Sequence, residues 1–120
     1  MPVTNEPAPY GAYTPDGLVR WVLERTRAAG DGWLAKRAAF LLRRLAIRRL
    51  AGRPVDVETL GAKFRLYPYN NVCEKRILFT PQYFDGRERE ILQARIKPGF
   101  VFIDVGANIG AYALFVAAHA

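Results

Sequence analysis

Apolar residues recur at helical spacing through much of the first half of the chain. Over 17–29 and again over 33–50 they return every three or four positions, which predicts two amphipathic helices. Gly30-Asp31-Gly32 separates the two segments. One stripe of the second helix consists of Leu34, Ala38, Leu41 and Leu45. We expect this stripe to pack on the core and the basic residues between its members to face water.

The pattern then changes to a period of two. Apolar and polar residues alternate over 55–59 and 63–67, and the three residues 60–62 between them include Gly61. Alternation of this kind is typical of half-buried strands, and a short loop with glycine joins strands of a hairpin. The sequence therefore predicts a β-hairpin with a three-residue loop.

Helical spacing returns after the hairpin. A short helix is predicted over 72–79, with Asn70 or Asn71 as its N-cap. A second helix over 87–96 should turn Ile91, Leu92 and Ile96 inward. The aromatic-rich loop over 80–86 between them is expected to fill an edge of the core, because aromatic side chains usually supply packing area.

The last segment has a hydrophobic pattern that no earlier segment shows. Residues 100–105 are apolar on both faces apart from Asp104, as in a parallel strand covered on both sides by helices. A turn over 106–109 follows, and an alanine-rich helix is predicted from Gly110 to Ala120. The expected fold class is therefore α/β, namely the start of a Rossmann-like fold preceded by N-terminal helices and a β-hairpin.

Four regions follow from these elements. Residues 1–16 hold four prolines and are expected to form a flexible lead-in. An N-terminal helical region covers 17–53. The hairpin and helices of 54–99 lead into a cofactor-binding domain, of which 100–120 would be the first βα unit.

Composition narrows the possible chemistry. The 120 residues carry a formal charge of +7, from 18 Lys and Arg against 11 Asp and Glu. One cysteine and one histidine exclude an intrachain disulfide and a cysteine-based zinc site, and we expect no bound metal. No signal peptide and no stretch long enough to span a bilayer is evident, so a cytoplasmic location is expected.

The basic helix over 33–50 leaves two interpretations open. A basic amphipathic face fits a membrane surface or nucleic acid, and in that case the protein would be non-enzymatic and act through this helix. Alternatively, its apolar stripe packs on the core and its arginines are solvated. We favour the second interpretation and expect no nucleic-acid partner, because no aromatic residues alternate with the arginines and no nucleic-acid motif is present.

The turn after residue 105 carries the candidate chemistry. Gly106 and Gly110 remove the Cβ atoms that would keep a ligand from the backbone, and Asn108 tolerates a positive φ. The helix that follows begins with free N–H groups. A carboxylate at the end of a buried strand is unfavourable without partners, so Asp104 predicts either loop N–H groups or a cationic ligand group beside it.

Several nucleotide sites share this strand, glycine-rich loop and helix. The fingerprint of nicotinamide and flavin dinucleotide enzymes fits residues 106–111 only with Asn108 in its second glycine position, where the backbone must approach the pyrophosphate. A dinucleotide-binding oxidoreductase therefore stays an alternative with a poor fit. The phosphate-binding P-loop is excluded, because no Gly-Lys-Ser/Thr follows.

Asp104-Val105-Gly106-Ala107-Asn108-Ile109-Gly110, with the apolar run before it, resembles motif I of S-adenosylmethionine-dependent methyltransferases. Together with the upstream block from Asn70 to Asp85, it is similar to the FkbM family, over roughly residues 55–119. The resemblance implies that Asp104 approaches the methionine amino group of S-adenosylmethionine. It also implies that the backbone of Gly106, Ala107, Asn108 and Gly110 wraps the methionine moiety.

The resemblance further implies an activity. Members of this family transfer a methyl group, typically to a hydroxyl oxygen of a sugar or another small-molecule acceptor. Alignment of the acceptor oxygen, the sulfonium methyl and the sulfur is the enzyme's main task, and a base then takes the proton. The sequence identifies no catalytic residue. We expect the chain to be the N-terminal fragment of a longer methyltransferase and, on its own, to be inactive and to bind cofactor poorly or not at all.

Overall fold

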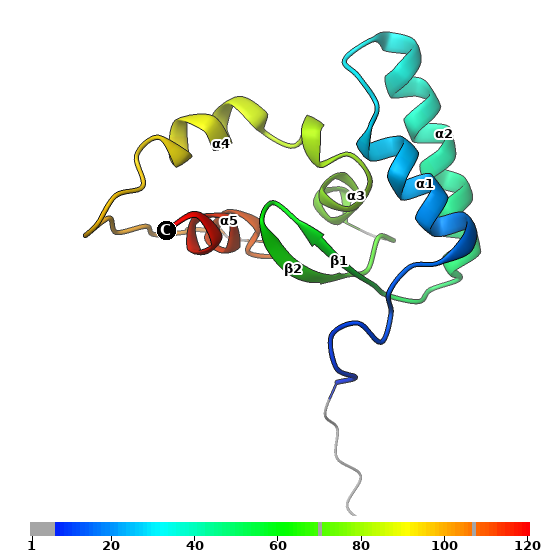
Figure 1. Ribbon diagram of the computed structural model, residues 1–120, viewed down its shortest axis with the longest axis horizontal. Helices are drawn as coiled ribbons and strands as arrows, with labels where there is room; N and C mark the ends of the chain where they lie inside the picture. The colour runs from blue at the N-terminus through cyan, green and yellow to red at the C-terminus, as the bar shows by residue number, and fades with distance from the viewer. Residues whose placement is uncertain (1–6, 70, 107) are drawn as a thin grey trace, which may run out of the picture.

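A computed structural model describes residues 7–69, 71–106 and 108–120. Two helices, a hairpin and three further helices follow one another along the chain. In order they are α1 (Gly17–Arg27), α2 (Trp33–Leu50), β1 (Val55–Thr59), β2 (Ala62–Leu66), α3 (Val72–Phe79), the 3-10 turn η1 (Pro81–Tyr83), α4 (Gly86–Gln93) and α5 (Ala111–His119). Figure 1 shows the hairpin and α3 between the α1–α2 pair and the α4–α5 end. The fold is mixed α/β, as predicted.

The hairpin differs from its prediction by one residue. β1 and β2 pair antiparallel from Val55↔Leu66 to Thr59↔Ala62, so the loop contains only Leu60 and Gly61. Both loop residues have positive φ, 54° and 78°. A two-residue turn of this kind matches the twist of the strands better than the predicted three-residue loop. The turn also packs on the end of α5, where a Cβ at Gly61 would lie 3.1 Å from Cε1 of His119.

The core is centred on α3 and the inner face of the hairpin, and α1, α2 and α5 add buried residues to it. Ile77, Leu78 and Phe79 are completely buried at the C-terminal end of α3. Thr59 Oγ1 donates a hydrogen bond of 2.7 Å to the carbonyl oxygen of Ile77, so the strand is held to the end of the helix. Burying an aliphatic or aromatic side chain of this size contributes about 1.5–3 kcal/mol. The short helix α3 is therefore stable through its packing, because a helix of this length is marginal alone.

Helix α1 is tied to the core by polar contacts at its C-terminal end. Arg27 donates from Nε to the carbonyl oxygen of Leu78 (2.9 Å) and from Nη1 to that of Glu58 (3.0 Å). Gln82 of η1 donates to the carbonyl oxygen of Thr26 at 2.7 Å. Burial lowers the pKa of the Arg27 guanidinium, which remains charged. The bond to Leu78 gives a partner to a carbonyl group in the last turn of α3, and the other two bonds join the end of α1 to β1 and to η1.

Helix α2 has the predicted bounds, but the predicted face is wrong. Ala39, Ala46 and Leu50 are buried, whereas Leu34, Leu41 and Leu45 are exposed. Ala46 and Leu50 belong to one buried cluster with the inner residues of α1. Small alanine side chains let α2 approach its neighbours closely. The larger leucine stripe is consequently turned to the outside.

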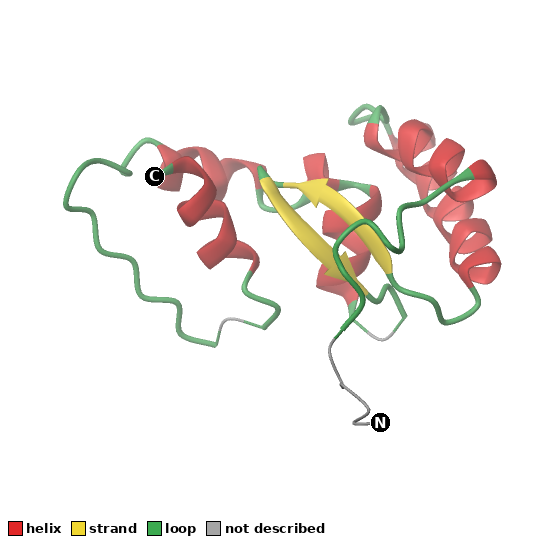
Figure 2. Ribbon diagram, turned by 60° about the horizontal axis from the view of Figure 1, so that its bottom comes forward, coloured by secondary structure: helices red, strands yellow, loops and turns green. Residues whose placement is uncertain are grey.

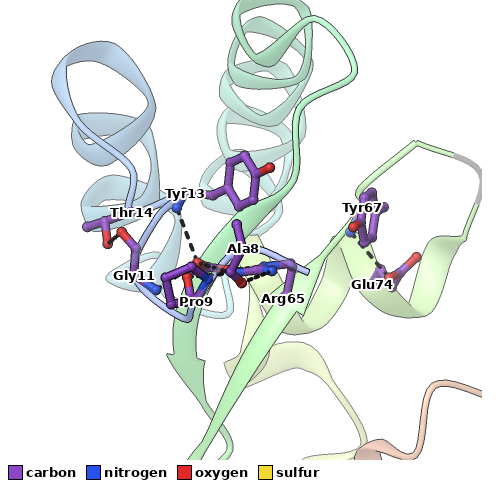
Figure 3. A network of polar contacts seen from close by, with 9 residues as sticks. Ala8, Pro9, Gly11, Tyr13, Thr14, Arg65, Tyr67 and Glu74 are labelled. Carbon is purple, nitrogen blue, oxygen red and sulfur yellow. Dashed lines mark hydrogen bonds and ion pairs between the residues drawn. The ribbon is translucent and has the colours of Figure 1, made fainter. Parts of the chain in front are cut away.

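The proline-rich start of the chain was expected to be a flexible lead-in, yet residues 8–14 are fastened to the hairpin (Figure 3). Asp56 of β1 accepts hydrogen bonds from the backbone N–H groups of Gly11 (2.8 Å) and Tyr13 (3.2 Å). Arg65 of β2 donates to the carbonyl oxygen of Ala8 at 2.6 Å and forms an ion pair with Asp56 at 2.7 Å. The side chain of Asp56 is fully buried. Residues 1–6 of the lead-in lie outside the described residues.

Helix α4 is shorter than predicted and ends at Gln93. Leu92 and Ile96 pack partly against the core, as expected, but Ile91 is exposed. In the adjoining loop Phe84 is buried, and Arg89 of α4 donates to its carbonyl oxygen at 2.7 Å. The prediction that an aromatic residue of this loop fills an edge of the core is confirmed for Phe84.

The predicted strand over 100–105 does not form. In Figure 2 the segment between α4 and α5 is a long loop that leads away from the hairpin. Ile103 is 80% and Val105 89% exposed. A strand requires a neighbour that accepts and donates its backbone hydrogen bonds, and the described part of the chain places none beside this segment. The described sheet is the antiparallel hairpin, so a Rossmann-like arrangement stays a prediction.

Candidate cofactor-binding site

The predicted loop has the backbone conformation that its residues favour. Gly106, Asn108 and Gly110 have positive φ values of 68°, 54° and 77°. The expectation that Asn108 adopts a left-handed conformation is confirmed, and asparagine tolerates it better than most residues do. Ala107, the remaining predicted loop contact, lies outside the described residues. The left-handed conformations turn the chain sharply into α5.

Space is open beside both glycines. A Cβ built at Gly106 or Gly110 would meet no atom of the described residues within 4 Å, leaving aside the chain neighbours. Glycine is therefore not needed here for packing within the chain. It satisfies the positive φ, and it leaves the backbone accessible to a ligand.

The loop ends at the N-terminus of α5. Gly110 is the N-cap residue, and no side chain caps the helix there. The N–H groups of the first turn have no partner within the helix, and together with the helix dipole they favour negatively charged or oxygen-bearing groups. This end of α5 can therefore donate hydrogen bonds to a ligand carboxylate.

Asp104 lies at the other end of the loop. Its Oδ2 atom is buried and has no hydrogen-bond partner among the described residues. A buried carboxylate oxygen without a partner is unfavourable by roughly 1–3 kcal/mol or more. Of the two partners expected from the sequence, loop N–H groups do not reach this oxygen in the described structure. A cationic ligand group remains a suitable partner.

The upstream block, residues 71–85, contacts the loop through Asn71. Asn71 Nδ2 donates a 2.8 Å hydrogen bond to Oδ1 of Asn108. The Oδ1 atom of Asn71 accepts from the backbone N–H of Cys73, also at 2.8 Å. Asn71 is thus the cap of α3, as one of the two predicted candidates, while Asn70 lies outside the described residues. One amide side chain both begins α3 and holds the loop.

A second contact joins α5 to the residue before α4. Tyr112 donates from its hydroxyl to Oδ2 of Asp85 at 2.7 Å, and its ring lies 6.0 Å from that of Phe84. Burial, together with the hydrogen bond to Asp85, raises the pKa of Tyr112. The phenol therefore stays protonated at neutral pH and positions α5 rather than accepting a proton. The sequence alone assigned no role to this pair.

We expect Asn71→Ala to remove both hydrogen bonds of the Asn71 side chain, the one with Cys73 and the one with Asn108. The expected loss in unfolding free energy is about 1–2 kcal/mol. Asn71→Asp separates the two roles, because a carboxylate still accepts from Cys73 but cannot donate to Asn108. Hydrogen–deuterium exchange measures the result. Asn71→Ala should speed exchange in both α3 and the first turn of α5, and Asn71→Asp only in the latter. Unchanged exchange near Asn108 in both variants would contradict the contact.

Comparison of the chain with protein-family models, with curated proteins and with solved structures finds no match. The resemblance described above therefore rests on the residues of this chain. None of the helices in the described part of the chain combines the length and the hydropathy that a membrane-spanning helix requires.

Proposed function

We propose that residues 104–110 form part of the S-adenosylmethionine site of a methyltransferase of the FkbM type. The observation that carries the proposal is the buried Oδ2 of Asp104, which has no hydrogen-bond partner among the described residues and lies beside a loop with open glycines. The methionine moiety of this cofactor carries an ammonium group and a carboxylate. Asp104 fits the first, and the uncapped start of α5 fits the second.

In this proposal the loop binds and orients the cofactor. The sulfonium methyl group is chemically activated already, so the protein mainly has to align it with an acceptor oxygen. The acceptor is a hydroxyl group of a sugar or another small molecule, following the resemblance. No base is assigned, since Tyr112 is held protonated by its surroundings. The work of the described residues is therefore binding rather than proton transfer.

The site needs more than these residues supply. In nucleotide folds of this class, a second parallel strand ends in an acid about 20 residues beyond the glycine loop and holds the ribose hydroxyls. The exposed side chains of Ile103 and Val105 fit a segment that pairs with further strands. We therefore propose that the site is completed by sequence outside these 120 residues.

The test compares two lengths of the protein and two cofactors. Calorimetry with S-adenosylmethionine and with oxidised nicotinamide dinucleotide is done on the 120-residue chain and on the full genomic reading frame that contains it. We expect micromolar binding of S-adenosylmethionine by the full reading frame, weak or no binding by the 120 residues, and no binding of the dinucleotide. Binding of the dinucleotide alone would favour an oxidoreductase. A reading frame that ends at codon 120, or micromolar binding by the 120 residues, would contradict an incomplete site.

A further inference from the structure

The outward face of α2 concentrates positive charge. The 18 residues of the helix include six cations and no acid, and five of the six cations are exposed. The cations are Lys36, Arg37, Arg43, Arg44, Arg48 and Arg49. Within the described residues, the two ion pairs are Arg20–Glu24 and Arg65–Asp56, and neither involves α2. The charge of this helix is thus uncompensated by neighbouring carboxylates, and it favours an anionic partner.

The same face carries exposed apolar side chains. Leu34, Ala38, Leu41 and Leu45, here called the Leu row, lie on one side of the helix because three, four and seven residues return to nearly the same direction. All four are exposed. A solvated basic face does not require such a row. Contiguous exposed apolar patches of more than a few hundred Å² are uncommon on soluble monomers, and they mark interaction surfaces.

Arginines line the Leu row at regular spacing. Arg37, Arg44 and Arg48, here called the Arg row, each follow a leucine of the Leu row by three residues. They therefore run beside it along the helix. Basic side chains of this length can place their guanidinium groups at a polar boundary while their stems cover apolar surface.

Aromatic side chains extend the face on the other side of the Arg row. The guanidinium of Arg37 lies 5.7 Å from the ring of Trp33, and that of Arg43 lies 4.4 Å from the ring of Phe40. An open hollow of about 510 Å³ lies over these residues; four of the seven side chains around it are cations. The face therefore combines apolar anchors, aromatic rings and cations with room between them.

We propose that the outward face of α2 docks onto an anionic lipid membrane, with the helix lying along its surface. Leucine side chains gain from entering the boundary between headgroups and acyl chains, while the adjacent arginines contact lipid phosphates. A nucleic acid would use the cations but offers little to an aliphatic row. The combination on one face favours lipid, and it does not depend on the proposed methyltransferase site.

Vesicle co-sedimentation tests the proposal with the 120-residue chain. The probes are phosphatidylcholine vesicles with and without phosphatidylserine, and a duplex oligonucleotide. We expect binding to the vesicles that contain phosphatidylserine, weakened by salt, and little binding to phosphatidylcholine alone.

Two variants with matched controls separate the contributions. Leu41→Gln should weaken vesicle binding by about tenfold, whereas Ile91→Gln on α4 should leave it unchanged; Leu41 is 60% and Ile91 50% exposed. Replacing the Arg row by glutamine should weaken binding by about a hundredfold. The control removes the same charge at Arg87, Arg95 and Lys97, all exposed and outside α2. Circular dichroism verifies that each variant is folded.

Each other outcome would overturn the proposal. No binding to phosphatidylserine vesicles at low salt would do so directly. Equal losses in the Arg-row variant and its control would indicate a general charge effect. Oligonucleotide binding that depends on the Arg row but not on Leu41, without vesicle binding, would assign the face to nucleic acid. Sedimentation as a dimer that Leu41→Gln converts to a monomer, without vesicle binding, would assign it to a second copy.

Discussion

Replacing Asp56 by alanine is expected to lower the free energy of unfolding by roughly 3 kcal/mol. The fully buried carboxylate forms an ion pair with Arg65 and accepts from the backbone N–H groups of Gly11 and Tyr13. Its removal leaves those two donors without their acceptor, and Arg65 without its counter-charge. We therefore expect this one substitution both to detach residues 11–13 from β1 and to weaken the pairing of β1 with β2.

Urea unfolding followed by circular dichroism measures this effect. Glu58→Ala is the matched control, because Glu58 is a carboxylate on the same strand and its side chain is exposed. We expect a change within about 0.5 kcal/mol for the control. Equal losses for the two variants would mean that the Asp56 network contributes nothing beyond the strand itself.

The carboxylate of Asp56 also makes the free energy of unfolding depend on pH. Hydrogen bonding from Arg65 holds the pKa of Asp56 at about 2, below the ordinary value of 3.8, with the N–H groups of Tyr13 and Gly11 adding to the effect against the opposing effect of burial. A depressed pKa in the folded state means that the contribution is fully present above pH 3.8 and is lost as the pH falls through about 2. The loss is roughly 2 kcal/mol. Asp56→Asn should remove this part of the pH dependence, and an unchanged acid profile would contradict it.

Local structure was largely predictable from the sequence. Both ends of α2 and of α3 agree with the helical spacing and with the glycines, prolines and asparagines beside them. Those signals act within a few residues, so no tertiary contact is needed to locate them. The hairpin was found for the same reason. The predicted loop was one residue longer than the observed loop. Leucine rarely adopts a positive φ, so Leu60 did not indicate a two-residue turn.

Orientation was less predictable, because it depends on partners distant in the chain. In α2 both the Leu row and the alanine side have helical spacing, and only contact with the rest of the protein decides which is buried. Residues 100–105 have the composition of a buried strand, but a strand forms only beside another. The contacts of Asp56 with residues 11 and 13 span more than forty positions, and no local pattern announces them.

The candidate site contains features that local sequence determines and features that depend on contacts distant in the chain. The positive φ of Gly106, Asn108 and Gly110 follows from residue type and was foreseeable. The contact between Asn71 and Asn108 joins two asparagines 37 residues apart, each of which has a local reason to be present. For Asp104 the sequence predicted that the carboxylate needs a partner, but it did not decide between loop N–H groups and a cationic ligand group. Among the described residues its Oδ2 atom has no partner.

Asp104→Asn is expected to lower the affinity for S-adenosylmethionine about a hundredfold in the full reading frame, and the methyl-transfer rate at limiting cofactor in proportion. Asparagine keeps the size and one acceptor oxygen but removes the charge that would balance the cofactor's ammonium group. Calorimetry gives the affinity, and transfer of a labelled methyl group gives the rate.

A purely structural role for Asp104 predicts a different pair of results. Because Oδ2 makes no hydrogen bond in the described structure, the neutral amide should leave the unfolding free energy of the 120-residue chain unchanged or slightly higher. Loss of affinity without loss of stability therefore identifies a ligand-facing carboxylate. Asn71→Asp serves as the comparison, since it disturbs the loop from outside while keeping the Asp104 charge. If Asp104→Asn destabilises the chain and leaves cofactor affinity intact, Asp104 belongs to the scaffold and the proposed ammonium contact is wrong.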